Sequence, residues 1–282
     1  MNKTARRKAL SAFVVILCGA AVVLALVPLF FVFAYVLQKG FSSLNWDFFT
    51  KAPKPVGETG GGMANAMVGT VYLIGIASAV AVPVGVIAGV YLSEYGKTKF
   101  AGLVRFTADV LNGVPSIVIG IFAYGLAVLP VKHFSALAGG LALGFMMIPI
   151  ITRTTEELLN LVPGSLREGA LALGATRARA AFSVMVPAAL PGIMTGILVA
   201  LARIAGETAP LLFTALNNRF FSWRLDQPIS SLPVQVYTYA VAPYEDWHRQ
   251  AWAGALVLVA FVFMFSVLAR IVTRRLERMH RA

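Results

Sequence analysis

Two opposite charges, Arg203 and Glu207, stand inside the long apolar stretch of residues 187–216. A charge at the bilayer centre costs at least about 2.5–3.5 kcal/mol on insertion scales, so such residues are candidates for function by default. Four residues apart in a helix, the two side chains would share one face. Arginine keeps its charge in any surroundings, and its planar fork matches phosphate-type oxyanions. The pair predicts a site for an anion in transit. The alternative is that the two charges neutralise one another and only hold helices together.

Catalytic and metal-binding chemistry lack the residues they need. The chain has one cysteine, Cys18, so it cannot form an internal disulfide. Its three histidines are far apart in the sequence and do not have the spacing of metal ligands. The segment Gly96-Lys97-Thr98 looks like the end of a phosphate-binding P-loop, but such a loop requires glycine where Tyr91 stands. We therefore expect no enzyme activity, no cofactor and no metal, and ATP hydrolysis would have to come from a separate protein.

The composition is that of a membrane protein. Of 282 residues, 59% are hydrophobic and 13% are charged, and the mean hydropathy is +0.79. Soluble domains carry about 25% charged residues, so this chain cannot cover a core with polar surface. The net charge of +12 lies in short clusters between apolar runs. That distribution orients membrane proteins, whereas a nucleic-acid binder would gather its basic residues on one face.

Six apolar segments are long enough to cross a bilayer, which requires roughly 20 residues each. They cover residues 11–37, 64–92, 110–129, 134–151, 187–216 and 252–271. The first is too long for the core of a signal peptide, so we expect a retained anchor. Most lysines and arginines outside these segments fall on one side of the membrane, which predicts that both termini are cytoplasmic.

The loop between the fourth and fifth segments carries helix signals. Ser165 and Glu168 fit the S-x-x-E capping box, in which each side chain satisfies an amide at a helix start. Gly174 stands where a helix ends in a residue of positive φ. These signals predict a short helix over residues 165–173, a sharp turn, and a basic helix leading into the fifth segment. A simple connector on the membrane surface is the alternative.

The spacing in this loop resembles the EAA motif of ABC importer permeases. That motif runs E-A-A, three residues, Gly, nine residues, and I-x-L-P. Here Glu168, Gly169, Ala170 and Gly174 are followed at the same offsets by Val184-Met185-Val186-Pro187. Gly169 replaces the first alanine, and two valines replace the isoleucine and leucine.

The resemblance implies an all-α integral membrane protein with six transmembrane helices and the type I ABC importer permease fold. In that family the short cytoplasmic helix is the coupling helix, which seats in a groove of the ATPase subunit. The expected division is residues 1–63 for the N-terminus, first span and following loop, 64–272 for the transmembrane domain, and 273–282 for a basic cytoplasmic tail.

Three further stretches resemble one permease subunit of phosphate-specific ABC importers. They are LNGVPSIVIG at residues 111–120, ITRTTEE at 151–157 and ARIAGETAPL at 202–211. The resemblance implies phosphate import across the bacterial inner membrane, with charges linked to transport at Arg153, Glu156 and Arg203. An anchoring role at the cytoplasmic end of span four is the alternative for Arg153.

The same resemblance implies three partners. They are a second permease subunit (PstC-like), a dimer of ATPase subunits (PstB-like) and a periplasmic phosphate-binding protein (PstS-like). Other functions remain open on the residues alone: a permease for another oxyanion such as molybdate or sulfate, a channel or secondary transporter that uses no ATP, or a membrane scaffold that transports nothing.

Overall fold

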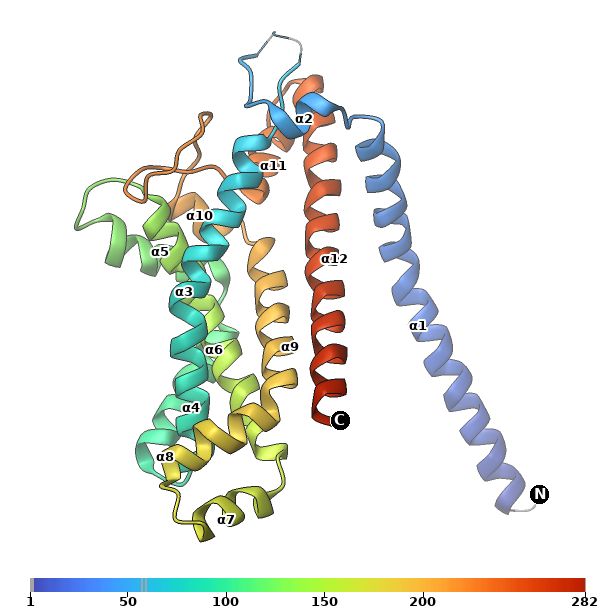
Figure 1. Ribbon diagram of the computed structural model, residues 1–282. Helices are drawn as coiled ribbons and strands as arrows, with labels where there is room; N and C mark the ends of the chain where they lie inside the picture. The colour runs from blue at the N-terminus through green and yellow to red at the C-terminus, as the bar shows by residue number, and fades with distance from the viewer. Residues whose placement is uncertain (1–2, 57, 59, 282) are drawn as a thin grey trace.

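The computed structural model describes residues 3–56, 58 and 60–281, and all regular secondary structure in these residues is helical (Figure 1). The long helices are connected by short ones and by two π-helical segments, η1 and η2. In chain order the elements are α1 (Lys3–Phe41), α2 (Trp46–Thr50), α3 (Ala64–Tyr95), α4 (Lys99–Gly113), α5 (Ser116–Ala123), η1 (Tyr124–Val128), α6 (Ala136–Leu161), α7 (Gly164–Ala172), α8 (Arg177–Ala180), η2 (Ala181–Met185), α9 (Val186–Ala205), α10 (Ala209–Thr214), α11 (Leu232–Ala240) and α12 (Glu245–Arg281).

Five helices in the described part of the chain are long and apolar enough to cross a membrane, and a bent helix pair makes a possible sixth. The five are α1, α3, α6, the continuous helix Arg177–Ala205 and α12. The bent pair is α4 with α5 and η1, whose axes differ by 110°. The sequence therefore predicts the apolar segments correctly, but the expectation of one continuous span over residues 110–129 is wrong.

The bend has a local cause at Val114 and Pro115. Val114 has an extended backbone with ψ 133°, which ends α4, and Pro115 immediately precedes α5. Proline lacks an N–H and its ring disfavours helical geometry at the preceding residue, so a helix ends at or before that residue. The apolar character of the segment continues through the bend, and hydropathy alone does not register the change of direction.

The expectation of one helix over residues 187–216 is also wrong. α9 ends at Ala205 and α10 begins at Ala209. At the end of α9 the N–H groups of Gly206 and Glu207 donate to carbonyls three residues back, on Arg203 and Ile204, which tightens the last turn. The break leaves a short linker, residues 206–208, within the apolar stretch.

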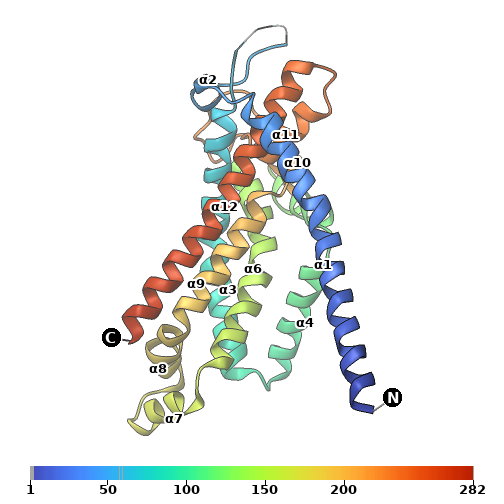
Figure 2. The same cartoon turned by 90° about the vertical axis from the view of Figure 1, so that its right-hand side faces the viewer.

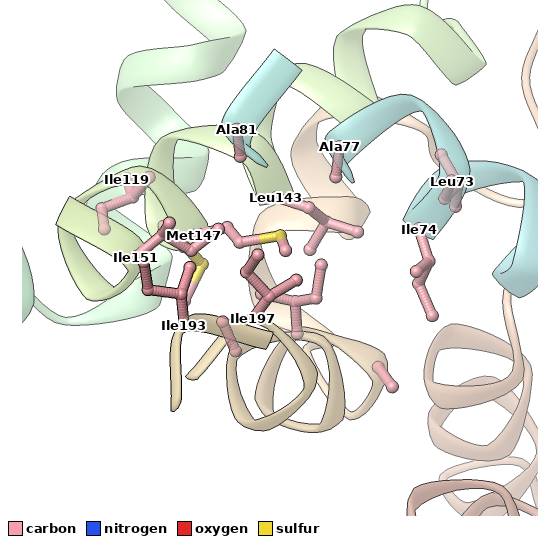
Figure 3. Packing of buried hydrophobic residues seen from close by; sticks show 14 of the residues in the cluster. Leu73, Ile74, Ala77, Ala81, Ile119, Leu143, Met147, Ile151, Ile193 and Ile197 are labelled. Carbon is pink, nitrogen blue, oxygen red and sulfur yellow. The ribbon is translucent and has the colours of Figure 1, made fainter. Parts of the chain in front are cut away.

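The core lies where α3, α6 and α9 pack along one another, with α5 at one end of the cluster (Figure 3). Small residues let the helix backbones approach closely. A Cβ atom on Gly89 of α3 would lie 2.6 Å from the Cβ of Thr155 on α6, and one on Gly196 of α9 would lie 2.4 Å from the Thr154 side chain of α6. Close contact through small residues is the usual way for helices to associate in lipid, where no hydrophobic effect drives them together.

Helix α1 stands apart from this core, and Figures 1 and 2 show it diverging from α12 along most of its length. It contacts α12 near its C-terminal end, where Tyr35 packs edge-on against Trp252 and Gly40 lies against Leu256. The rest of its apolar surface is exposed, as expected for a helix facing lipid or another subunit. Both chain ends lie toward the end of the molecule that carries α7 (Figure 1).

Candidate functional site

Four charged residues form a connected cluster between α4 and α6. The Glu156 carboxylate accepts hydrogen bonds from Nε of Arg105 at 2.5 Å and from a terminal nitrogen of Arg153 at 2.6 Å. Nε of Arg153 lies 3.1 Å from a carboxylate oxygen of Asp109. The Glu156 side chain is only 4% exposed, and two arginines satisfy its charge. Two acids and two bases thus balance one another within the chain.

Arg105 also closes the end of α3. Its terminal nitrogens donate to the backbone carbonyls of Gly96 at 2.8 Å and Leu92 at 3.2 Å. The last carbonyls of a helix have no partner within the helix, and a cation there is further favoured by the helix dipole. Arg105 therefore joins α3, α4 and α6 at one point, an arrangement that favours a structural role for Glu156.

Sequence reasoning missed both Arg105 and Asp109. Arg105 is indistinguishable from the other basic residues that gather on one side of a membrane protein. One signal was present: the two residues are four apart in α4, so they share a helix face and carry opposite charges. Their partners on α6 are distant in sequence and could not be found from spacing.

Arg203 and Glu207 do not share a helix face. Arg203 lies in the last turn of α9 and is exposed, whereas Glu207 lies in the linker after the helix and is half-buried. Among the described residues, no ion pair joins either side chain to an opposite charge. The prediction of a shared face was wrong, because the helix ends between the two residues, at Ala205.

Two of the motif stretches meet beside this linker. Gly120 of α5 faces Pro210 of α10, and a Cβ on Gly120 would lie 2.6 Å from the Cα of Pro210. The first stretch ends at Gly120 and the other stretch, residues 202–211, contains both Arg203 and the helix break. Any side chain at position 120 would push α10 away and shift the linker that holds Glu207.

The short helix α7 matches the predicted position of the coupling helix within one residue, Gly164–Ala172 against 165–173. Its end is also as predicted. Gly174 has φ +83°, its N–H donates to Leu171 O at 2.9 Å, and the N–H of Ala175 donates to Ala170 O at 3.1 Å. These two bonds are the Schellman pattern that satisfies the final carbonyls of a helix. The predicted capping box is wrong: the residue before α7 is Pro163, and no side chain caps the helix start.

α7 buries none of its residues, although several of them are apolar. Glu168 and Gly169 are exposed and Ala170 is half-buried. Leu166 and Leu171 are also exposed, and Leu173 just after the helix is 91% exposed. Figure 1 shows α7 at the extreme end of the molecule, beyond the ends of α3, α6 and α9. Several exposed leucines in and just after a projecting helix are typical of a surface that another protein covers.

A family model described as "Binding-protein-dependent transport system inner membrane component" matches residues 81–278. The fold is similar to that of the MetNI methionine ABC transporter in an inward-facing conformation, with a TM-score of 0.60 and 20% identity over 75% of this chain and 93% of the other. The chain therefore belongs to the family of binding-protein-dependent inner membrane transport components, and the predicted ABC importer permease fold is confirmed.

Sequence relatives narrow the family further. The chain is 44% identical to the phosphate transport system permease protein PstA of Haemophilus influenzae, over 89% of each protein. It is 42% identical to the PstA protein of Yersinia pestis over 96% of this chain and 92% of that one, and 47% identical to the PstA protein of Xylella fastidiosa strain 9a5c over 83% and 82%. Within the permease family, the chain belongs with the PstA proteins.

Proposed function

We propose that this chain is a transmembrane subunit of an ATP-driven importer that moves inorganic phosphate into the cytoplasm. The observation that carries the proposal is the extent of the similarity: relatives named as phosphate transport permeases match 42–47% of aligned residues over most of the chain. The exposed arginine at the α9–α10 break supports an anionic substrate, because a guanidinium can grip a phosphate with two parallel hydrogen bonds.

The complete importer would contain a second permease subunit (PstC-like), an ATPase dimer (PstB-like) and a periplasmic phosphate-binding protein (PstS-like). Both termini and α7 would lie in the cytoplasm, and the membrane would be the bacterial inner membrane. The exposed leucines of α7 support ATPase docking, since a groove in the partner would cover them. Glu168, Gly169, Ala170 and Gly174 would form the coupling element.

The predicted pathway residues differ in whether they have a charged partner within the chain. Arg203 and Glu207 have no charged partner within the described chain, so they are available to a substrate or to the second permease. Glu156 is enclosed by two arginines and would act by holding α3, α4 and α6 together. Arg153 is partly exposed and paired on two sides, so its contribution to the pathway would require release from Asp109.

The proposed mechanism gives Arg203 and Glu207 opposing effects on the substrate. An arginine in surroundings of low dielectric would hold an anion too strongly for release, and transit requires binding that is weak enough to reverse. A carboxylate in the adjoining linker offsets part of that attraction. Phosphate would then pass the break in a transient, partly dehydrated state.

The decisive experiment is ATP hydrolysis by the reconstituted complex in lipid vesicles, with the binding protein and phosphate supplied. We expect phosphate to stimulate hydrolysis and to accumulate inside the vesicles, whereas sulfate and molybdate should do neither. The purified chain alone should hydrolyse no ATP. Equal stimulation by the other oxyanions would overturn the substrate assignment, and uptake without ATP would overturn the transporter class.

Docking of the ATPase on α7 has its own test. Gly174→Val places a β-branched residue at a positive φ, where such residues are outliers, and should misplace α7. Glu168→Lys and Leu173→Asp should weaken docking directly, while Leu173→Met keeps an apolar side chain and serves as the matched control. We expect the three disruptive variants to insert normally but to lose transport and retain less ATPase on purification. If all three variants transported at the parental rate, the loop would be a simple connector and the docking proposal would be wrong.

A further inference from the structure

The single charge of α3 is joined to α7. In the whole of α3, Glu94 is the one charged residue, and it lies in the last turn. Its carboxylate contacts a terminal nitrogen of Arg167 on α7 at 2.9 Å, and its side chain is only 7% exposed. Among the described residues, this is the one ion pair that links α7 to a membrane helix.

The last turns of α3 are also held from two other helices. Arg105 of α4 donates to Leu92 O and Gly96 O, and Ser93 Oγ donates to the side-chain oxygen of Asn160 on α6. The Glu94–Arg167 pair adds α7 at the same place. Three elements thus meet at the cytoplasmic end of α3, and only α7 among them projects from the bundle (Figure 1).

The surroundings of the pair leave it room to move. A cavity of about 600 Å³ lies beside it, lined by the end of α3, by Arg105 and by Arg167 and Leu171 of α7. Nε of Arg167 is buried without a hydrogen-bond partner, so its guanidinium is held from one end only. Because Arg167 is held only by Glu94 in the described part of the chain and borders the cavity, its side chain can adjust when α7 is displaced and keep its contact with Glu94.

We propose that the Glu94–Arg167 ion pair is a coupling contact that carries displacement of α7 into α3. The inference rests on the proposed function, since it presumes an ATPase that moves α7. The covalent connections of α7 run to α6 and to α8. The ion pair gives it a separate connection to α3, which packs along α6 throughout the core. Glu94 and Arg167 are therefore positioning residues, acting on the pathway through the helices that they join.

The test is a double-mutant cycle in the assembled complex, with Glu94→Gln, Arg167→Gln and the two combined. Each single variant should raise the amount of ATP hydrolysed per phosphate imported at least roughly fivefold, the lower end of ordinary coupling between sites. The combined variant should be no worse than either single one, because all three remove the same contact. Arg177→Gln is the matched control, since Arg177 lines the same cavity but is exposed.

The outcomes separate this inference from the proposed function. If the single variants keep the parental ratio, or if they only lower the amount of assembled complex, the ion pair is structural and the inference is wrong. Loss of transport in Leu173→Asp in the same preparation would show that α7 still couples the ATPase. If the parental complex imports no phosphate, the proposed function itself fails and the ratio has no meaning.

Discussion

Two groups of charged residues in the apolar part of this chain differ in whether they have oppositely charged partners within the chain. The cluster of Arg105, Asp109, Arg153 and Glu156 between α4 and α6 is paired internally, with each acid bonded to a base on the neighbouring helix. Arg203 and Glu207, at the α9–α10 break, have no charged partner among the described residues. In hydrocarbon, an unpaired charge is costly and persists only where it has a use or a partner from outside.

From this contrast we infer that removing a paired charge and removing an unpaired charge should affect different properties of the protein. Removing Glu156, the buried member of the cluster, leaves two arginines without their shared anion, which should first be detected as lost stability. Removing Arg203 leaves no orphaned charge in the described chain, so its effect should fall on transport with little loss of folded protein. The predictions below test this division, beginning with the largest expected effect.

The largest effect is expected for Glu156→Gln. The variant keeps the size of the side chain but leaves two arginines without their shared anion, and breaking a buried pair costs about 3–5 kcal/mol. Glutamine can still accept one hydrogen bond, so we expect the lower end of that range. The measurement is the amount of assembled complex and its unfolding temperature in detergent. A variant that assembles and melts like the parent would remove the structural interpretation of the cluster.

A smaller effect on a different property is expected for Arg203→Lys. Lysine keeps the charge but lacks the planar fork, so one of two charge-assisted hydrogen bonds to an oxyanion is lost. At roughly 1.5 kcal/mol for such a bond, uptake should fall about tenfold per assembled complex. The unfolding temperature should stay at the parental value. Full uptake with lysine would show that charge alone suffices at this position.

Glu207→Gln should change turnover by less. The half-buried carboxylate would no longer offset the attraction of Arg203, so phosphate should be bound more tightly and released more slowly. We expect a lower maximal uptake rate together with a lower half-saturating concentration, measured on vesicles with the binding protein saturating. If only the maximal uptake rate or only the half-saturating concentration changed, Arg203 and Glu207 would not have opposing effects on the substrate.

The smallest effect is expected for Asp109→Asn. The Asp109 side chain is 58% exposed, and exposed ion pairs contribute about 0–1 kcal/mol. Arg153 keeps its bond to Glu156, so the stability of the complex should change little. Comparison of Asp109→Asn with Glu156→Gln in one melting experiment ranks the exposed and buried halves of the cluster. Equal losses would mean that the cluster acts as one unit.

The sequence predicts what depends on composition and on local residues. Apolar segments locate the membrane helices because length and hydropathy set the spans, and Gly174 marks the end of α7 because only glycine takes its backbone angle freely. The EAA spacing and the motif stretches predict the family, which the relatives confirm. The division at residues 63 and 272 remains a prediction; the family model covers 81–278.

The sequence-based prediction is wrong where a helix-ending residue lies within an apolar stretch, and it misses ion pairs whose partners are far apart in the sequence. Pro115 and Gly206 are helix-ending residues inside apolar stretches, and hydropathy conceals them because the composition does not change. The capping box fails at Ser165 because α7 starts one residue earlier, directly after Pro163. Arg105 meets Glu156 across 51 residues of sequence, so only the packing of α4 on α6 reveals the pair.

The contrast between the paired cluster and the unpaired residues Arg203 and Glu207 is tested most directly by phosphate uptake in Arg203→Gln, normalised to the amount of assembled complex. Glutamine is polar but shorter and uncharged, and position 203 is exposed at the end of α9, so assembly and unfolding temperature should match the parent. Arg6→Gln, an exposed change in α1 outside the core, controls for the loss of a charge. We expect uptake to fall to the background of vesicles without ATP. Parental uptake by Arg203→Gln would contradict the assignment of Arg203 to the pathway.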